Sequence, residues 1–410
     1  MELKPGYKQT EVGVIPEEWE VKALKEISPK QSVGLVINPS TYFDPQESIP
    51  MLVGSNVTEN RIDAEAANRI SAASNVKLAA SRLTQGDLVT VRVGEPGVTA
   101  VIPPELDQCN CASMMIVRQD RSFNSHWLCS AMNSRHGRQQ VENVQYGTAQ
   151  KQFNIKDAVN FIYAVPPLQE QNQIATVLSE LELLLRNLEQ VITKKREIKQ
   201  AAMQELLTGK RRLPGFEGEW VAGKLGDYVE KIVGGGTPSR ANPGFWGGEI
   251  PWATVKDLTI FQPNQTQEWL TRDGLKNSSA NLIPAGTLIA STRMALGKAV
   301  IFATDVAINQ DLKAIFFGKN GMARFFCYWF EANASAIDAI GGGSTVKGIS
   351  LSQLKALDVA NPGLAEQNAI VDVISDIETE IETLENRLTK TRALKQAMMQ
   401  ELLTGRIRLR

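Results

Sequence analysis

The sequence is poor in cysteine and histidine, and these shortages argue against two classes of site. It contains four cysteines in 410 residues, three of them between positions 109 and 129. These thiols are too few and too clustered for a disulfide framework. The sequence therefore predicts a protein of a reducing compartment, the cytoplasm. The histidines, His126 and His136, lie near Cys109, Cys111 and Cys129, but no CxxC pair or HxxxH spacing accompanies them. We therefore expect no metal site, and buried thiols with ordinary histidines instead.

Long apolar runs and an excess of positive charge are also lacking. No stretch approaches the ~18 uncharged apolar residues of a membrane helix, and residues 1–8 show no apolar core of a signal peptide. The chain has 44 basic and 45 acidic residues, for a net charge of −1. Basic and acidic residues number 16 and 18 in residues 1–165, and 13 each in residues 214–362. Generic nucleic-acid binders usually carry a basic excess, so DNA binding here would depend on local basic loops.

The most informative feature that the chain does contain is a duplicated segment. Residues 166–213 align without a gap on residues 362–409, at a constant offset of 196. Within them, 199–209 and 395–405 are identical at ten of eleven positions. Two copies make a duplicated protein and not a solenoid, which needs at least three stacked units. A chain of two similar halves is expected to offer two similar surfaces to two similar partners. A further match pairs Glu170–Asn172 with Glu366–Asn368.

Both duplicated segments carry a helical pattern. Their apolar residues recur at alternating spacings of three and four, a period of 3.5 that is typical of a coiled-coil seam. Pro166 and Pro362 mark the helix starts, and Gly209 and Gly405 suit the left-handed position that ends them. Helices of about 35–40 residues would be rods of roughly 55 Å. We predict that the helices pair with each other; the alternative is that each packs on one globular core. The seam residues are Ile174, Val177, Leu181, Leu184, Leu188 and Val191, then Ile374, Ile377, Ile381, Leu384 and Leu388.

The regions between the repeats have the composition of mixed α+β domains. Short runs rich in β-branched residues are punctuated by Gly, Pro and Asn, which predicts strands at 87–93, 99–102, 287–292 and 298–302. The two regions also echo each other. Glu18–Trp19 matches Glu219–Trp220, and Gly147–Lys151 matches Gly343–Lys347. Near-identical helices with divergent domains indicate one scaffold that carries two different reading surfaces.

Several motifs flank the repeats: Gly6–Trp19, Leu213–Trp220, Gly235–Ser239, Trp246–Trp252, and the helix ends Glu205–Gly209 and Glu401–Gly405. Together with the order of variable domain, repeated helix, variable domain and repeated helix, they resemble the DNA-specificity subunit of type I restriction–modification systems. The resemblance covers essentially the whole chain. One departure is the stretch Cys109–Ser113, which stands where the family commonly has Asn/Ser-Gln and where the second domain has Asn309–Gln310. A contact role is therefore not transferred to Ser113.

This resemblance implies an architecture and a set of partners. The implied fold is α+β, with two similar α/β target-recognition domains at residues 1–165 and 214–361. Two helical spacers at 166–213 and 362–410 would pair as an antiparallel coiled coil, giving a pseudo-twofold internal repeat. Each domain would recognise one half of a bipartite double-stranded DNA target. A methyltransferase subunit would dock near each half, and restriction subunits would complete the complex.

The resemblance also implies where the cofactors are bound. S-adenosylmethionine, ATP and Mg²⁺ would be bound by the partner subunits, and this chain would hold no cofactor. The helices would set the spacing between the two half-sites. Two readers on one face of DNA need centres about one helical turn, ~34 Å, apart, which rods of roughly 55 Å can span.

Polar loops near strand ends are the candidate DNA contacts. Base recognition uses Arg or Lys for guanine and Asn or Gln for adenine, projected into the major groove. The loop before each helix is the first choice, two arginines after similar strands come next, and the glycine loop of the second domain follows. For each residue, an ordinary solvated loop is the alternative. The candidates are Thr148, Gln150, Lys151, Gln152, Ser344, Thr345 and Lys347, then Arg92 and Arg293, then Thr237, Ser239 and Arg240.

The helix ends are candidates for contact with another protein. The helices are nearly neutral in charge, which suits a protein surface better than a DNA groove. We assign the last helical turns to docking of a partner subunit or, equally, to capping of the coiled coil. The residues are Glu205, Leu206, Leu207, Glu401, Leu402 and Leu403.

Motifs of catalysis are missing from the sequence. Asn242–Phe245 and Val165–Leu168 do not fit the Asp/Asn-Pro-Pro-aromatic motif of an amino-methyltransferase. The glycine runs 234–236 and 341–343 are not followed by the Gly-Lys-Ser/Thr of a P-loop, which leaves a flexible turn or a phosphate contact. The leading hypothesis is therefore a non-catalytic targeting subunit. The alternatives are a coiled-coil scaffold that joins two protein-binding domains without nucleic acid, and an enzyme with a site between the halves.

Overall fold

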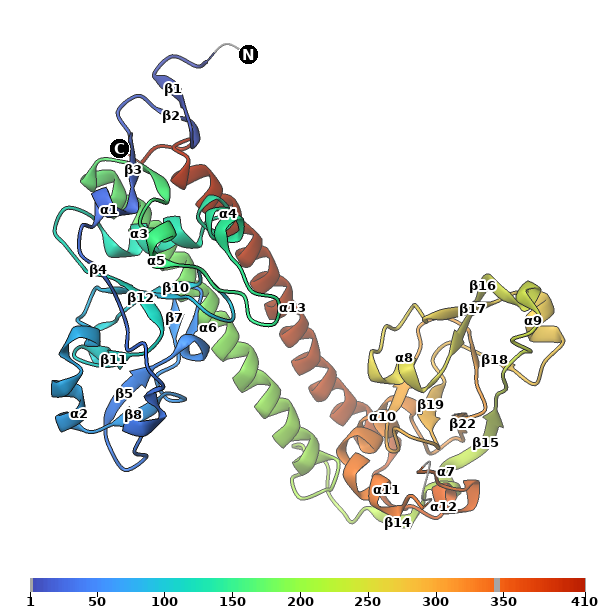
Figure 1. The fold of residues 1–410 in the computed structure, drawn as a ribbon. Helices are drawn as coiled ribbons and strands as arrows, with labels where there is room; N and C mark the ends of the chain where they lie inside the picture. The colour runs from blue at the N-terminus through green and yellow to red at the C-terminus, as the bar shows by residue number, and fades with distance from the viewer. Residues whose placement is uncertain (1–2, 343–346, 410) are drawn as a thin grey trace. The chain divides into compact units, whose positions relative to one another are not determined.

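The computed structural model describes residues 3–342 and 347–409, which divide into two compact units (Figure 1). Unit 1 consists of Met1–Glu189 and Asn386–Arg410, and unit 2 consists of Gln190–Glu385. The division falls inside both long helices, α6 (Leu168–Leu206) and α13 (Leu364–Leu403). Each unit therefore contains part of each repeat, and the packing units cut across the four stretches expected from the sequence.

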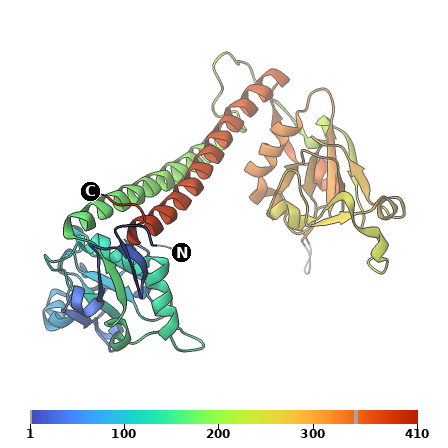
Figure 2. The same cartoon turned by 90° about the horizontal axis from the view of Figure 1, so that it is seen from above.

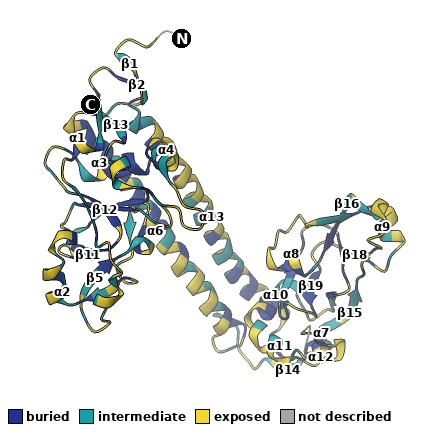
Figure 3. Cartoon of the chain, viewed as in Figure 1, coloured by how far each residue is buried: buried dark blue, intermediate teal, exposed yellow. Residues whose placement is uncertain are grey.

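Unit 1 is built on two small sheets. The first is antiparallel, in the order β10-β9-β12-β4, and the second has the order β11-β5-β8 with β11 and β5 parallel. Figure 3 shows their strands largely buried, as expected from their β-branched composition. The strands are β4 (Gln31–Val33), β5 (Ile49–Leu52), β8 (Asn68–Ile70), β9 (Leu88–Val91), β10 (Thr99–Val101), β11 (Asn110–Cys111) and β12 (Met114–Val117). Smaller pairs are β1 (Tyr7–Thr10) with β2 (Gly13–Pro16), β3 (Glu20–Ala23) with β13 (Ile162–Val165), and β6 (Val57–Thr58) with β7 (Arg61–Ile62).

Unit 2 repeats this plan. Its sheets have the orders β15-β22-β19-β20 and β17-β16-β21-β18, and β16 and β21 are parallel, as β5 and β11 are in unit 1. The expectation that the two domains share a fold is therefore confirmed. The strands are β14 (Val221–Lys224), β15 (Val229–Gly234), β16 (Trp246–Ala253), β17 (Glu268–Leu270), β18 (Asn281–Ile283), β19 (Leu288–Ser291), β20 (Ala299–Ile301), β21 (Val306–Ile308), β22 (Leu312–Phe317) and β23 (Asp358–Asn361, paired with β14).

Short helices cover the sheets in both units. In unit 1, α3 is capped by Asn124, whose side chain accepts from the Trp127 N–H at 3.0 Å. The N–H of Asn124 donates to Gln171 Oε1 of α6 at 2.9 Å, and in unit 2 the N–H of Met322 donates to Gln367 Oε1 at 2.9 Å. The repeated glutamine thus fixes a domain helix to the start of each long helix. The helices are α1 (Leu24–Ile27), α2 (Ala72–Lys77), α3 (Ser125–Asn133), α4 (Arg135–Val144), α5 (Ile155–Ala158), α7 (Leu225–Tyr228), α8 (Val255–Thr259), α9 (Arg272–Lys276), α10 (Ala323–Ala332), α11 (Ala334–Ile340) and α12 (Leu351–Lys355).

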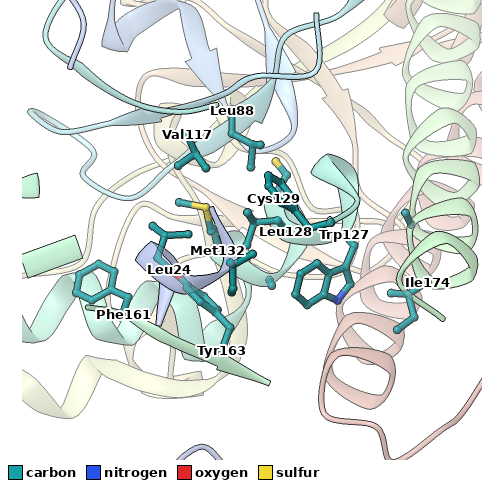
Figure 4. Packing of buried hydrophobic residues seen from close by; sticks show 14 of the residues in the cluster. Leu24, Leu88, Val117, Trp127, Leu128, Cys129, Met132, Phe161, Tyr163 and Ile174 are labelled. Atoms are coloured by element: carbon teal, nitrogen blue, oxygen red, sulfur yellow. The ribbon is translucent and has the colours of Figure 1, made fainter. Parts of the chain in front are cut away.

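Each unit completes its core with a helix end from the other repeat. In unit 1, Trp127 and Ile174 are fully buried among residues of the sheet and of α3 (Figure 4), and Met399 and Leu402 of α13 belong to the same cluster. In unit 2 the cluster is aromatic, around α10, and Leu206 of α6 belongs to it. Because the hydrophobic effect scales with apolar area removed from water, these helix ends stabilise the unit on which they pack.

The long helices pair antiparallel within each unit (Figures 1 and 2). In unit 1, Lys395 Nζ lies 2.7 Å from Glu182 Oε2, and in unit 2 Lys199 Nζ lies 2.9 Å from Glu378 Oε1. Residue numbers rise along one helix as they fall along the other. Lys199 pairs with Glu378, whereas Arg196, earlier on α6, contacts Glu385, later on α13, with 2.5 Å between Nη2 and Oε1. The expected antiparallel coiled coil and internal repeat are therefore confirmed.

The seam itself differs in part from the predicted one. Ile174 and Leu188 are buried as expected, but Val191 is 41% exposed while its neighbour Ile192 is buried. Leu185 is buried as well and was absent from the predicted seam. The apolar stripe is wider than a simple two-helix seam because each helix also packs on a domain. Within the described residues, no helix is long and apolar enough to cross a membrane.

Candidate nucleic-acid interface

In unit 1, the loop that was expected before the long helix lies between α4 and α5 and folds back as a short hairpin onto the segment that follows β9. Tyr146 and Gln152 exchange two backbone hydrogen bonds of 2.9 Å. The hairpin is fixed to the strand end by Gly94, whose N–H donates to the Lys151 carbonyl at 3.0 Å, and by a bridge between Val93 and Gln152. The first-choice loop therefore lies beside a strand end. Of the predicted contact residues, Thr148, Gln150 and Lys151 are exposed, and Gln152 is half-buried.

In unit 2 the described ends of the matching loop make equivalent contacts. The Met294 N–H donates to the Lys347 carbonyl at 2.9 Å, and Arg293 forms a bridge with Gly348. Gly342 and Gly348 exchange backbone hydrogen bonds of 3.2 and 3.1 Å. The pre-helix loop and the strand end, predicted separately, thus form one surface in each unit. The remaining predicted residues of this loop, Ser344 and Thr345, lie outside the described residues.

The bridges to the two loops show which residues at the two strand ends are equivalent. Val93 forms a bridge with Gln152 in unit 1, and Arg293 forms a bridge with Gly348 in unit 2. Gln152 and Gly348 are equivalent at the repeat offset of 196, so Val93, and not Arg92, is the counterpart of Arg293. Arg92 is half-buried, and its Nε is buried without a hydrogen-bond partner in the described part of the chain. Both arginines follow similar strands, as expected, and a DNA contact by Arg92 stays a prediction, one residue before the counterpart of Arg293.

The glycine loop of unit 2 is explained mainly by close packing. A Cβ at Gly235 would lie 1.9 Å from the Ile308 carbonyl oxygen, and one at Gly236 would lie 1.9 Å from Ser279 Oγ. The Gly236 N–H donates to the Ile308 carbonyl at 3.0 Å. Since that N–H is already used, the glycines serve the approach of this loop to β21 rather than the binding of a phosphate by Gly236. Thr237, which follows them, is exposed.

Side-chain contacts connect the glycine loop to the strand-end arginine. Thr237 Oγ1 donates to Gln310 Oε1 at 2.7 Å. Next in sequence, Asp311 Oδ1 lies 3.6 Å from Arg293 Nη1. Asp311 is itself held by Asn309, whose Nδ2 donates to its Oδ2 at 3.1 Å. The structure therefore brings Thr237, Arg293 and Lys347 of the prediction into one continuous region of unit 2.

Arg240 and Ser239 lie on another part of the same loop. The Arg240 guanidinium binds both carboxylate oxygens of Glu268, and its carbon Cζ lies 3.7 Å from the centre of the Trp246 ring. The hydrogen bond from Arg240 keeps the pKa of Glu268 below its ordinary value. The Ser239 carbonyl accepts from Trp246 Nε1 at 3.2 Å. This guanidinium would have to share or leave Glu268 to contact a base, so its predicted role competes with an internal ion pair.

The matching region of unit 1 lacks the polar network. Ala112 follows β11 as Asn309 follows β21, so Ser113 stands where unit 2 has Gln310. The N–H of Ser113 donates to the Leu35 carbonyl at 2.9 Å, with a left-handed φ of 56°. No residue of unit 1 corresponds to Asp311, because β12 begins directly after Ser113. The two units therefore share a backbone frame and present different chemistry on it.

Two lysines near Arg293 differ in how strongly their ammonium groups are bound to neighbouring residues. Lys313 Nζ donates to the Gln310 carbonyl at 2.6 Å, and burial lowers the pKa of Lys313 below its ordinary value. Lys347 Nζ lies 2.7 Å from Asp338 Oδ2, and both side chains are about half exposed. An exposed ion pair of this kind contributes about 0–1 kcal/mol. Lys347 can therefore exchange Asp338 for a phosphate or a base at little cost.

The predicted docking residues fall into two groups. Leu206, Leu207 and Leu402 are at most 5% exposed and belong to the chain's own cores. Packing in these cores leaves the three side chains no exposed surface for a partner, and capping of the coiled coil stays a prediction. Leu403 is half-buried and lines a groove of about 950 Å³ in unit 1 between α4, the β6–β7 turn and α13. Docking stays a prediction for Leu403, for Glu205, which pairs with Arg211, and for Glu401, which pairs with Arg406.

Sequence reasoning missed a pair of polar ties at the helix ends. In unit 1, Glu170 accepts from Trp19 Nε1 at 3.0 Å and from Arg408 at 2.7 and 2.9 Å. In unit 2, Glu366 accepts from Trp220 Nε1 at 3.1 Å and from Arg212 at 2.5 and 2.7 Å. Glu170 and Glu366 are related by the repeat offset of 196, as are Arg212 and Arg408, and this offset could have revealed them. Each tryptophan uses its indole N–H inside its own unit and so has a structural role.

Three of the four cysteines, Cys109, Cys111 and Cys129, are buried, and Cys327 is half-buried. Burial raises the pKa of Cys109 and Cys327 to about 12 each, and it raises the pKa of Cys111 and Cys129 further. A thiol with so high a pKa carries little thiolate at neutral pH and is a poor nucleophile. Among residues 3–342 and 347–409, no group of three or more His, Cys, Asp or Glu side chains is placed to hold a metal ion.

Comparison with known proteins identifies relatives of the whole chain. Residues 16–200 and 217–391 each match the family model of the type I restriction modification DNA specificity domain. A putative type I restriction enzyme MjaX specificity subunit of Methanocaldococcus jannaschii is 23% identical over 99% of this chain and 97% of its own. The Escherichia coli EcoR124I/EcoR124II specificity subunit is 25% identical over 55% of this chain and 56% of its own. A type I restriction–modification S subunit structure from M. genitalium has a TM-score of 0.60 at 12% identity, over 98% of each chain, and so shares the fold.

Proposed function

Because the chain belongs to the family of type I restriction modification DNA specificity domains, its role is DNA specificity, and we propose that it recognises a bipartite sequence with one unit on each half. The observation that carries this proposal is the repeated surface. In unit 1 an exposed polar loop between α4 and α5 is hydrogen-bonded to the end of a sheet strand, and in unit 2 the described residues of the matching loop, through the Lys347 carbonyl, are bonded to the equivalent strand end. One frame used twice, with different side chains, supports two different half-sites.

Local loops supply the charge that the chain lacks overall. The net charge of −1 gives no general attraction to DNA. Lys151 is exposed at the loop of unit 1, and Lys347 is half exposed at the loop of unit 2. A lysine that replaces one phosphate counterion adds about one unit to the salt dependence of binding, whatever the base sequence. We assign these two lysines to the backbone of DNA and leave base recognition to their neighbours.

The catalytic steps are assigned to partners. The chain would bring two methyltransferase subunits, and restriction subunits where present, to the split sequence, and those partners would bind S-adenosylmethionine, ATP and Mg²⁺. The spacing of half-sites would follow from the paired helices of 39 and 40 residues, about 60 Å at 1.5 Å per residue. The assembled complex, and not this chain by itself, is therefore the form in which function is tested.

The direct test maps methylation. The chain is co-expressed with its cognate methyltransferase in a host without adenine methylation, and modified bases are located by single-molecule sequencing. We expect a split motif, methylated in both halves and absent without this chain. A stable complex that methylates nothing would favour a protein scaffold instead.

A second test concerns the two loop lysines. Lys151→Ala or Lys347→Ala should weaken DNA binding by the assembled complex about 3-fold to 10-fold and lower the salt slope by about one, with assembly intact. The exposed lysines Lys77→Ala on α2 and Lys276→Ala on α9 are the matched controls. Unchanged binding in both loop variants would refute the loop assignment.

A further inference from the structure

The strand-end position that touches the hairpin carries different chemistry in the two units. The N–H of Val91 donates to the Val98 carbonyl at 2.8 Å, and the N–H of Ser291 donates to the Lys298 carbonyl at 2.9 Å, so residues 91 and 291 are equivalent. Two residues later, Val93 and Arg293 form the equivalent bridges to the hairpins. Unit 1 therefore presents an apolar side chain where unit 2 presents a guanidinium.

Arg293 is both exposed and oriented. Its side chain is 61% exposed, and Nη1 lies 3.6 Å from Oδ1 of Asp311, which is only 11% exposed. Asn309 binds Asp311 twice at 3.1 Å, through Nδ2 to the carboxylate and through Oδ1 to the N–H of Asp311. The Asp311 carbonyl accepts from the Thr292 N–H at 2.9 Å. A fixed carboxylate thus lies within ion-pair distance of one nitrogen of a solvent-facing guanidinium, beyond hydrogen-bond length, and its charge favours the orientation in which the arginine lies beside it.

The backbone next to Arg293 is also unusual. Met294 has a φ of 64°, in the left-handed region, although it is not a glycine and its side chain is 52% exposed. The equivalent residue of unit 1 is Gly94, with a φ of 96°. Non-glycine residues in this region cost about 1 kcal/mol and persist where the surroundings impose the turn. Here the Met294 N–H donates to the Lys347 carbonyl at 2.9 Å, which ties the turn beside Arg293 to the neighbouring loop.

We propose that Arg293 recognises a guanine in the half-site bound by unit 2, through the paired acceptors O6 and N7 in the major groove. This proposal rests on the proposed function. An arginine can donate two hydrogen bonds to those acceptors, and no other base presents that pair. Asp311 acts as the positioning residue. Val93 has no donor, so the half-site bound by unit 1 carries no guanine requirement from the equivalent position.

The test uses the assembled methyltransferase complex and a randomised pool of split DNA targets, sequenced before and after selection. With the wild-type chain, one position of one half-site should require guanine. In Arg293→Ala that requirement should relax by about 10-fold to 100-fold at that position alone, while the other half-site stays unchanged. Arg293→Lys keeps the charge and a donor for guanine but loses the fixed fork geometry, so it should relax the same position less than Arg293→Ala does while retaining overall affinity. Arg272→Ala, an arginine of α9 that is 85% exposed, is the matched control and should change nothing.

Three outcomes separate the possible failures. A wild-type complex that selects no split sequence refutes the proposed function itself. A wild-type split motif whose guanine requirements all survive in Arg293→Ala refutes only the guanine contact. A uniform loss of affinity without relaxation at one position shows a phosphate contact by Arg293, which also overturns the proposal. The converse variant Val93→Arg should add a guanine preference to the other half-site, and an unchanged motif there would count against the equivalence of positions 93 and 293.

Discussion

Leu206→Ala should destabilise unit 2 and leave unit 1 largely unaffected, although Leu206 ends the helix that follows the first domain in sequence. The side chain is 5% exposed and packs in the aromatic core of unit 2, with Phe325 and Phe326 of α10. Truncation of a buried leucine to alanine costs about 2–5 kcal/mol, from lost transfer energy and the cavity left behind. Leu402→Ala is the mirror experiment, because Leu402 is fully buried in the core of unit 1.

Amide hydrogen exchange measured by peptide mass spectrometry resolves the two units. At 1.4 kcal/mol for each factor of ten, Leu206→Ala should speed exchange in α10 (Ala323–Ala332) by about 30-fold or more. Exchange in α3 (Ser125–Asn133) should stay close to the wild-type rate. Leu183→Ala provides the control, since Leu183 lies on the same helix and is 51% exposed. Faster exchange in α3 with α10 unchanged would show that the helix end packs on its own domain, and would refute the exchange of helix ends between repeats.

Two further predictions concern the ion pairs between the long helices. Lys395→Met should lower the free energy of unfolding measured in urea by about 1–3 kcal/mol, because Glu182 is 10% exposed and would lose this ion pair while its contact with Arg61 remains. The exposed Lys194→Met is the control, and equal losses of stability in both variants would contradict the argument. Stability should also fall in acid: burial raises the pKa of Glu182 and Glu378, but hydrogen bonds to these carboxylates, from Lys395 and from Tyr328 and Lys199, lower it overall. Their contribution to the free energy of unfolding is therefore complete above the ordinary carboxyl pKa and is lost as the pH falls through the lowered pKa. A melting temperature that increases when the pH is lowered from 5 to 3 would contradict this assignment.

The fold was accessible from the sequence where a local pattern repeats. The expected strands 87–93 and 287–292 contain β9 (Leu88–Val91) and β19 (Leu288–Ser291), because short β-branched runs bounded by turn residues specify strands locally. The helices were expected at 166–213 and 362–410 and end at Leu206 and Leu403. Gly209 and Gly405 have φ values of 69° and 67°, in the left-handed region that stops a helix.

The sequence did not reveal on which domain each helix end packs, or which residues at the two strand ends are equivalent. Periodicity identifies an apolar face and does not identify the domain on which it packs, so Leu206 and Leu402 were assigned to docking of a partner or, equally, to capping of the coiled coil. The sequence placed Arg92 and Arg293 only as following similar strands, because the offset between the domains changes along the chain. It is 200 at the strand end and 196 at the hairpin, and only the bridges Val93–Gln152 and Arg293–Gly348 fix the equivalence.

The pattern of sameness and difference between the repeats follows from where the contacts lie. Glu170 binds Arg408 and Glu366 binds Arg212, so each tie joins one repeat to the other. A change at one member of such a tie must be matched in the other copy, which favours identical residues in both. In the described part of unit 2, by contrast, Arg293 of the reading surface contacts Asp311 of its own domain. Each surface can therefore change without disturbing the scaffold, and a chain built in this way can acquire two different half-site preferences while keeping one architecture.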